Sequence, residues 1–468
     1  MNISRRKFLS SISLLAASTS FPLSAFSLKS NNEKLKIVLV GTGHRGITFW
    51  GKRLVDEYSE LLQFVGLCDI NPGRLEYGKK YIGVTCPTFT NFEEMIRTTK
   101  PDLVIVTTRD SNHHEFIIKG MEMGCDILTE KPMTIDEQKC QDILYAERKT
   151  GKNLIVGFNY RWGPYNTKIK ELISENTIGR LTSVNFHYTL NTHHGASYFR
   201  RWHGLRQGGG TLLVHKATHH FDLLNWWINS DPDEVFAYGD LEFYGTNGPF
   251  SGDKCRTCKH QSECEFYFDI TRDDHLMKLY VHNEHHDGYI RDNCLFRKEI
   301  NIYDKMSVQA KYKNNVVLNY SLTTYSPFEG WRVAFEGTEG RIEAFLDIPY
   351  FNRIAEDQAE LHAREMDQSE EKADDLEYDS IFVHNMWHKE FKTVQVPAER
   401  TGHRGGDRRL QDKLFTRPDE TDIYERSAGS RDGAMSVLIG IAARKSIESG
   451  EIIKIAELTD LEPRKNRI

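Results

Sequence analysis

The densest group of chemically capable side chains follows a run of three glycines at residues 208–210. His215, His219 and Asp222 come after it, at spacings of four and three residues. Residues with these spacings share one face of an α-helix, so we expect the three side chains to point in one direction. Two imidazoles and a carboxylate on one face can move protons or bind a metal ion. His220 falls on another face and is expected to be structural.

A second candidate is Lys131, which stands in the sequence Glu130-Lys131-Pro132 after a predicted strand over residues 126–129. Ligands of open α/β sheets bind at the carboxyl ends of the strands. A lysine there can donate a hydrogen bond to a reacting hydroxyl or carbonyl, and its pKa falls when it is partly buried. Lys131 is therefore a candidate for hydrogen-bonding a reacting oxygen. The alternative is an ordinary loop lysine before proline.

A glycine-rich turn, Gly41-x-Gly43-x-x-Gly46, connects an apolar run at 36–40 to a predicted helix. This pattern predicts a dinucleotide site, because the glycines permit a tight turn, close approach of a pyrophosphate and close helix packing. Asp69 follows the next apolar run, 64–68, where an acidic residue binds the ribose hydroxyls of NAD. An NADP site more often has a basic residue there. The sequence therefore predicts NAD, with an ordinary glycine turn as the alternative.

These residues need a scaffold, and the apolar patterning predicts an α/β protein with two domains. Residues 33–158 alternate short strands with helices, as in the parallel βαβ sheet of a Rossmann domain. The predicted strands there are 36–40, 64–68, 103–107, 126–129 and 153–157. The predicted helices are 46–57, 92–99, 112–123 and 135–149.

The second predicted domain, 159–468, has longer strands in which apolar and polar residues alternate. These strands are 181–190, 235–243, 307–313 and 316–324, and helices are predicted at 165–175, 216–228 and 431–449. The pattern favours an α+β domain with a large open, mostly antiparallel sheet. Two polar stretches, about 246–300 and 347–425, are predicted to be insertions around that sheet.

Residues 1–27 are predicted to be a targeting segment outside the fold. Arg5 and Arg6 precede a modestly apolar stretch with small residues near its end, which resembles a twin-arginine signal peptide. No other run is long enough to span a membrane, so no span is expected in the mature protein. We expect export to the periplasm. The net charge of -6 is small for 468 residues, and no basic patch indicates nucleic acid.

Several of these motifs, in this order, resemble the glucose–fructose oxidoreductase / inositol dehydrogenase / rhizopine catabolism family (Gfo/Idh/MocA). The resemblance covers roughly residues 35–345. It implies a Rossmann domain, an α/β substrate domain, a carbohydrate substrate, and Lys131 and His219 as catalytic residues. The family usually has an aspartate where this chain has His215, so the general base stays open between His215, His219 and Lys131. We also expect a homo-oligomer formed through the open sheet.

The motifs and the resemblance together imply two further sets of site residues. The expected cofactor-binding residues are Gly41, Gly43, His44, Arg45, Gly46, Asp69, Thr108, His113, Glu130 and Lys131. The expected substrate-binding residues are Tyr160, Arg161, Trp162 and His403.

Three functions fit these features. The first is an exported NAD-dependent oxidoreductase that acts on a ring hydroxyl of a sugar, glycoside or cyclitol with a tightly bound cofactor. The second is a redox-neutral NAD-dependent glycoside hydrolase or epimerase of the same superfamily, whose glycine- and histidine-containing loop resembles residues 402–407. The third is a sugar-binding protein without turnover, which the presence of both Lys131 and His219 disfavours.

Four cysteines lie in or near the first insertion: Cys255, Cys258, Cys264 and Cys294. The Cys-x-x-Cys pair fits a structural zinc site. Two disulfides are the alternative, since they suit an oxidising compartment. The sequence slightly favours zinc, and either role is structural.

Overall fold

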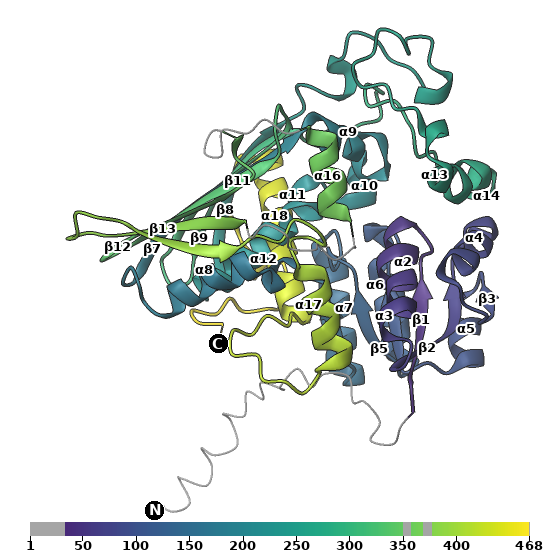
Figure 1. The fold of residues 1–468 in the computed structure, drawn as a ribbon, viewed down its shortest axis with the longest axis horizontal. Helices are drawn as coiled ribbons and strands as arrows, with labels where there is room; N and C mark the ends of the chain where they lie inside the picture. The colour runs from purple at the N-terminus through teal and green to yellow at the C-terminus, as the bar shows by residue number, and fades with distance from the viewer. Residues whose placement is uncertain (1–32, 350–356, 368–376, 468) are drawn as a thin grey trace, which may run out of the picture.

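The computed structural model describes residues 33–349, 357–367 and 377–467, so the predicted signal segment 1–27 lies outside the described residues. Two sheets form the core of the molecule (Figure 1). The first has six parallel strands in the order β3-β2-β1-β4-β5-β6, the doubly wound arrangement of a Rossmann domain. The second has nine strands and is mixed but mostly antiparallel. The predicted fold class is confirmed.

The strands of the first sheet are short and apolar, because helices cover both faces. They are β1 (Leu35–Val40), β2 (Leu62–Cys68), β3 (Thr88–Phe89), β4 (Leu103–Val106), β5 (Asp126–Thr129) and β6 (Leu154–Val156). The first helical segment starts directly after the glycine turn, as α2 (His44–Ile47), a π-helical stretch (Thr48–Lys52) and α3 (Arg53–Tyr58). The other helices are α4 (Pro72–Ile82), α5 (Phe92–Thr99), α6 (His113–Glu122) and α7 (Glu137–Thr150).

The second sheet has the order β14-β13-β12-β11-β7-β10-β9-β8-β15, and only β7 and β10 pair in parallel. Its strands are β7 (Leu181–Asn191), β8 (Pro232–Asp240), β9 (Lys305–Tyr312), β10 (Val317–Ser326), β11 (Gly330–Gly337), β12 (Gly340–Leu346), β13 (Tyr378–Asn385), β14 (Lys392–Pro397) and β15 (Ile453–Lys454). Buried and more exposed residues alternate along β9 and β10, so one face of the sheet packs on the core and the other is open.

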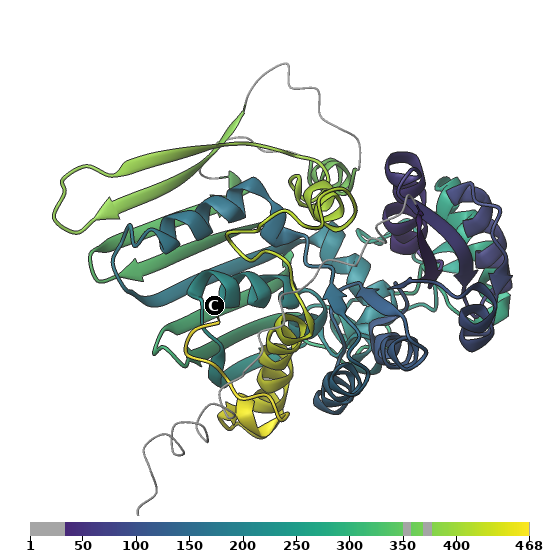
Figure 2. The ribbon, with the colours of Figure 1, turned by 90° about the horizontal axis from the view of Figure 1, so that it is seen from below.

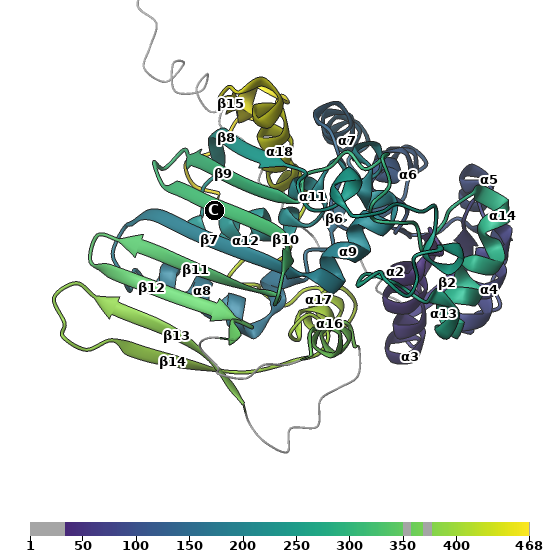
Figure 3. The ribbon, with the colours of Figure 1, turned by 90° about the horizontal axis from the view of Figure 1, so that it is seen from above.

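Helices cover one face of this sheet (Figure 2), and no helix of the described residues covers the opposite face (Figure 3). The covering helices are α8 (Pro164–Ser174), α12 (Ala217–Ile228) and α18 (Ser430–Ser449). Shorter helices lie towards the first sheet: α9 (Thr192–Arg200), α10 (Arg206–Gly209), α11 (Leu212–His215), α16 (Gln358–Met366) and α17 (Gly406–Gln411). Helix α18 ends at Gly450, whose positive φ of 73° caps it as the sequence predicts.

Residues 246–300 are mostly irregular and extend from the second sheet to the nucleotide-binding half. They include α13 (Asp274–Leu279) and α14 (Glu284–Asp287), which lie beside α4 (Figures 1 and 3). Leu279 and Tyr280 are buried in the same hydrophobic cluster as β1 and α3. The insertion therefore completes the core of the nucleotide-binding half. Among the described residues, no helix is long and apolar enough to cross a membrane.

Candidate active site

A cavity of about 610 Å³ lies where the carboxyl ends of the parallel strands meet α9, α11 and α12. Most of the predicted site residues line it, although they come from distant parts of the chain. They are Gly41, Gly43, His44, Arg45, Asp69, Thr108, His113, Glu130, Lys131, Tyr160, His215, His219 and His403. The structure therefore brings the glycine turn and both candidate catalytic motifs to one place.

Three of the predicted residues do not line this cavity. Gly46 packs under the turn, where an added Cβ would lie 2.3 Å from the carbonyl oxygen of Gly41. The side chain of Arg161 is 2% exposed and forms ion pairs with Asp222 and Asp432. Trp162 is buried in the core of the nucleotide-binding half. The prediction that Arg161 and Trp162 contact substrate is therefore wrong, because both side chains serve the protein interior.

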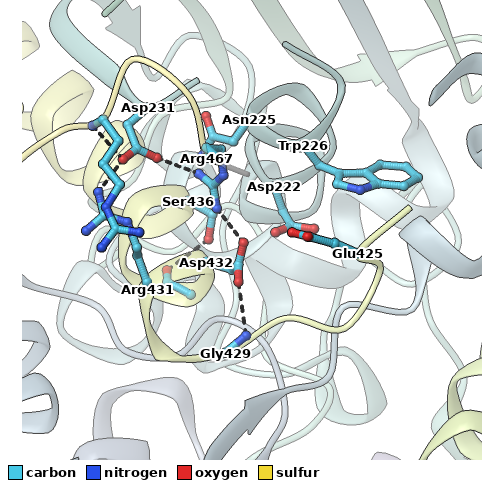
Figure 4. A network of polar contacts seen from close by, with 12 residues as sticks. Asp222, Asn225, Trp226, Asp231, Glu425, Gly429, Arg431, Asp432, Ser436 and Arg467 are labelled. Atoms are coloured by element: carbon cyan, nitrogen blue, oxygen red, sulfur yellow. Dashed lines mark hydrogen bonds and ion pairs between the residues drawn. The ribbon is translucent and has the colours of Figure 1, made fainter. Parts of the chain in front are cut away.

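The shared face predicted for His215, His219 and Asp222 is also wrong. Only the two histidines reach the cavity, although a break in the helix at Lys216 separates α11, which carries His215, from α12, which carries His219. Asp222 instead lies 2.5–2.7 Å from the Arg161 guanidinium. Figure 4 shows Asp222 beside Asp432, which accepts a hydrogen bond from the backbone of Gly429 and pairs with Arg467. Asp222 thus helps to join α12 to α18.

His215 forms a pair with Asp110, whose carboxylate lies 2.5 Å from its Nδ1. Burial lowers the pKa of His215 well below its usual value, and the charges of Lys131 and His203 lower it further. Burial also raises the pKa of Asp110, although the charge of Lys131 opposes this. The sequence analysis missed Asp110. Its place just after β4, at the carboxyl edge of the sheet, is the signal that could have found it.

Lys131 is held in the cavity wall, with its Nζ 3.5 Å from the backbone oxygen of His215. Burial lowers its pKa to about 8, while the carboxylates of Asp110 and Glu130 act in the opposite direction. A lysine with this pKa exchanges a proton near neutral pH and donates strongly to an oxygen that gains negative charge.

The ring of His219 stacks on Tyr160, with centroids 4.1 Å apart and planes inclined by 12°. Its Nδ1 is buried and has no hydrogen-bond partner among the described residues. Burial lowers the pKa of His219 well below its usual value, and Lys131 and Lys216 add to this shift. His219 is therefore a neutral imidazole. The Nζ of Lys216, which sequence reasoning also missed, lies 3.4 Å from the Tyr160 hydroxyl.

Arg45 and Glu130 belong to a network that connects the two halves of the protein. The Nε of Arg45 donates to Glu130 at 2.8 Å, and its Nη2 lies 3.2 Å from Asp407. Glu130 also accepts from the indole of Trp50 at 2.7 Å, and Asp407 lies 2.8 Å from the Nδ1 of His403. These carboxylates are occupied by protein partners, so their role is to position the cavity wall.

Asp69 lies at the end of β2, where the sequence predicts a ribose-binding acid. One carboxylate oxygen accepts from the backbone and hydroxyl of Thr42. The other lies 3.0 Å from Arg74, which also pairs with Asp287 of the insertion at 2.6 Å. Two carboxylates therefore compensate the charge of Arg74.

The glycine turn fits a dinucleotide on steric grounds. Gly41 has a φ of +93°, and an added Cβ would lie 2.7 Å from the backbone carbon of Thr107. Only glycine allows this close approach. His113 connects the loops that follow β4 and β5, because its ring nitrogens lie 2.8 Å and 3.2 Å from the backbone oxygens of Pro132 and Thr108. Bound NAD would therefore lie along Gly41, Gly43 and Asp69.

The four insertion cysteines are free thiols, so the disulfide alternative is not found. Zinc is not supported at these cysteines either. In the described parts of the chain, only His194, Glu329 and His362 bring three metal-capable atoms within 4.8 Å of one another. Burial lowers the pKa of His194 well below its usual value, and the charges of Lys216 and Arg201 lower it further, so a cation bound beside it would meet the same repulsion. We assign no metal to this cluster.

Comparison with known proteins agrees with this site. Residues 35–158 match an oxidoreductase family model with an NAD-binding Rossmann fold, and residues 170–455 match its C-terminal alpha/beta domain. The fold and the site define an NAD-binding oxidoreductase of the dehydrogenase type. The chain belongs to the Gfo/Idh/MocA oxidoreductase family, which confirms the resemblance.

A full-length relative is YteT of Bacillus subtilis (strain 168), which carries a provisional description as an oxidoreductase. It is 35% identical over 444 residues, which cover 91% of this chain and 99% of YteT. An inositol 2-dehydrogenase/D-chiro-inositol 3-dehydrogenase of Lactiplantibacillus plantarum is 24% identical over 166 residues. That match covers 35% of this chain and only 45% of the inositol enzyme.

Two solved structures share the fold at low sequence identity. Levoglucosan dehydrogenase, in complex with NADH and levoglucosan, has a TM-score of 0.63 and 17% identity. The alignment covers 90% of this chain and all of that enzyme. The WlbA dehydrogenase of Bordetella pertussis, bound to NADH and UDP-GlcNAcA, has a TM-score of 0.59 and 15% identity, over 90% of this chain and 99% of WlbA.

Proposed function

We propose that this protein is an exported oxidoreductase that oxidises a ring hydroxyl of a sugar, glycoside or cyclitol and keeps NAD tightly bound. The observation that carries the proposal is the single cavity that joins the glycine turn, Lys131, His215 and His219. The sugar and inositol dehydrogenases among its relatives support the substrate class. When bound, NAD supplies the hydride acceptor.

In the proposed reaction, Lys131 donates a hydrogen bond to the oxygen of the reacting hydroxyl. His219 takes the proton of that hydroxyl, because it is neutral and its Nδ1 has no partner in the described part of the chain. His215 is the second candidate base, but its Nδ1 is engaged by Asp110. The carbon loses a hydride as the oxygen loses its proton, which leaves a carbonyl.

A redox-neutral glycoside hydrolase or epimerase is the second candidate. The observation in its favour is the loop 402–407, which brings His403 to the cavity wall beside Tyr160, with ring centroids 5.9 Å apart. In that reaction, oxidation is followed by cleavage or inversion and then by reduction of the same sugar. The substrate's own carbonyl then returns the cofactor to its starting state.

Mass spectrometry of natively purified protein, with and without candidate glycosides, separates these functions. An oxidised sugar and reduced cofactor support the oxidoreductase, whereas a cleaved or inverted sugar with unchanged cofactor supports the second candidate. Protein that arrives without any nucleotide, and yields no sugar product with added NAD, contradicts both.

Export by the twin-arginine route is part of the proposal, and it accounts for a tightly held cofactor. The route carries folded proteins, and little free NAD exists outside the cytoplasm. We expect periplasmic activity that is lost when Arg5 and Arg6 are both replaced by lysine. Equal activity in both cell fractions for the variant and the wild type contradicts export by this route.

A homo-oligomer formed through the open sheet is also proposed. The hairpin between β13 and β14 extends from this sheet and exposes Met386, Trp387 and Phe391, with Trp387 85% exposed. Exposed aromatic groups of this kind favour protein contacts. Light scattering of wild type and Trp387→Asp tests it, since a monomeric wild type contradicts the proposal.

A further inference from the structure

The insertion covers the entrance to the glycine turn with side chains of its own. The hydroxyl of Tyr280 accepts a hydrogen bond from the backbone N–H of His44 at 2.9 Å. His275 lies 3.1 Å from the His44 ring and 2.9 Å from the Tyr77 hydroxyl. An added Cβ at Gly43 would lie 3.5 Å from the Tyr280 hydroxyl. A phosphate seated on this turn would therefore contact the insertion as well as the Rossmann domain.

Two arginines beside this turn lack a counter-charge. Arg291 lies in the insertion and Arg201 follows α9, and both line the cavity together with Gly43 and His44. Among residues 33–349, 357–367 and 377–467, no carboxylate pairs with either guanidinium, and the two lie over the rings of Tyr198 and Tyr280 instead. The Nε of Arg291 is buried without a hydrogen-bond partner, and the Nε of Arg201 donates to the backbone oxygen of Ser197.

Two other arginines of the cavity are compensated by carboxylates. Arg45 and Arg74 line the same space, and each contacts two carboxylates. Arg201 and Arg291 instead affect each other, since burial and then the charge of Arg291 lower the pKa of Arg201 to about 10. Both side chains are half-buried, and two such like charges without a counter-ion repel each other, so an anion that binds there is stabilised.

The two arginines also set the potential at the glycine turn. After burial, the charge of Arg291 is the largest cause that lowers the pKa of His44, and Arg201 contributes too. The guanidinium of Arg291 lies 5.4 Å from the centre of the Tyr280 ring, whose hydroxyl contacts His44. The two guanidiniums therefore raise the positive potential at the segment that carries Gly43 and His44.

We propose that Arg201 and Arg291 bind the pyrophosphate of NAD from the insertion side and close the dinucleotide between two layers of protein. The two negative charges of a pyrophosphate match the two unpaired guanidiniums, and charge-assisted bonds from arginine to phosphate are among the strong hydrogen bonds. The proposal goes beyond the family motif, because Arg291 belongs to the insertion. These contacts would slow the dissociation of NAD, which the proposed export requires.

Release of NADH measures this role without any turnover. We expect Arg291→Gln and Arg201→Gln each to raise the NADH dissociation rate about ten- to hundredfold, the range for one charge-assisted hydrogen bond. Fluorescence after rapid mixing with excess NAD follows the release. Arg272→Gln is the matched control, because its side chain is 86% exposed in the same insertion. Arg291→Lys keeps the cation and should restore much of the retention.

A second ligand identifies which anion the arginines bind. ADP-ribose has the pyrophosphate but no nicotinamide, and its calorimetric affinity should fall in parallel with NADH retention. Glucuronate is a sugar carboxylate, and its binding should not change. If the variants weaken glucuronate but spare ADP-ribose and NADH, the arginines serve a substrate carboxylate and the proposal is overturned. Unchanged NADH release in both glutamine variants overturns it too, while sugar oxidation remains a separate question.

Discussion

The Rossmann wall of the cavity and its substrate end differ in how many of their polar groups have partners. In the Rossmann wall, Asp69 is paired with Arg74 and Glu130 with Arg45, all within the nucleotide-binding half. At the substrate end, the Nδ1 atoms of His203 and His219 are buried without partners among the described residues, and Lys131 has only a long contact to a backbone oxygen.

This difference distinguishes residues that position the cavity wall from residues that are available to contact a ligand. A buried polar atom without a partner costs about 1–3 kcal/mol, so it persists where a ligand will satisfy it. The paired groups are already satisfied, and they fix the walls against which substrate and cofactor rest. We therefore expect substitutions at the substrate end to remove activity, and substitutions in the paired networks to remove stability.

The strongest test of this contrast is Lys131→Ala. We expect turnover to fall by about 10²–10⁴-fold, the usual contribution of a positioned proton donor, while NADH binding and fold are retained. Initial rates with the sugar identified by mass spectrometry, and an NADH fluorescence titration, measure the two effects. Lys80→Ala, at an exposed lysine of α4, is the control. A variant with near-normal turnover would show that Lys131 is not catalytic.

The two histidines sharpen the assignment at the substrate end. We expect His219→Asn to lower turnover by about 10²–10⁴-fold. His215→Asn should have a much smaller effect, because His219 has the unengaged ring nitrogen. Rates for both variants, with exposed His388→Asn as control, decide between them. A larger loss for His215→Asn would transfer the role of base to the His215–Asp110 pair.

Asp407→Ala tests the paired networks. Asp407 is fully buried and contacts Arg45, Asn159 and His403, so its removal leaves buried polar groups uncompensated. We expect the free energy of unfolding to fall by about 3–5 kcal/mol, measured by urea denaturation. Asp419→Ala, at an exposed position, should have little effect. A stability loss as large in His219→Asn would remove the distinction between the two ends.

The preference for NAD over NADP is expected to depend on Asp69, and replacing Asp69 should have a smaller effect than the substitutions above. A 2′-phosphate beside this carboxylate meets a repulsion of about 1–4 kcal/mol, so NAD should bind at least about fivefold more tightly than NADP. Asp69→Ser should reduce this preference, because Arg74 loses one of its two carboxylates. Titration of nucleotide-free protein with both cofactors measures the ratio, and equal affinities in the wild type would contradict the assignment.

The smallest expected effect is a pH dependence. If Lys131 acts as a protonated donor, activity is full below its pKa of about 8 and falls as the pH rises through that value. We expect a roughly tenfold loss per pH unit above it, seen in kcat/KM at constant ionic strength. Lys131→Arg should lose this alkaline limb, since arginine stays protonated. A rate that increases above pH 8 would instead make Lys131 the base.

The sequence predicted what local patterns determine. The apolar runs at 36–40 and 103–107 are strands of the parallel sheet, and Gly41, Asp69, Lys131 and His219 line one cavity. It could not predict pairings between distant segments. Asp110 meets His215 across 105 residues, and the burial of Arg161 depends on Asp222 and Asp432. Export and oligomeric state stay predictions.

Leu279 and Tyr280 complete the nucleotide-binding core, but the ribosome makes them well after the strands of that core. The stretch between the end of β6 and the start of α13 is roughly 120 residues long, which takes about 6–24 s to synthesise at 5–20 residues per second. Throughout that time the glycine turn exists without the segment that covers it. We expect NAD to reach the turn more easily in this interval than after the insertion has folded over it.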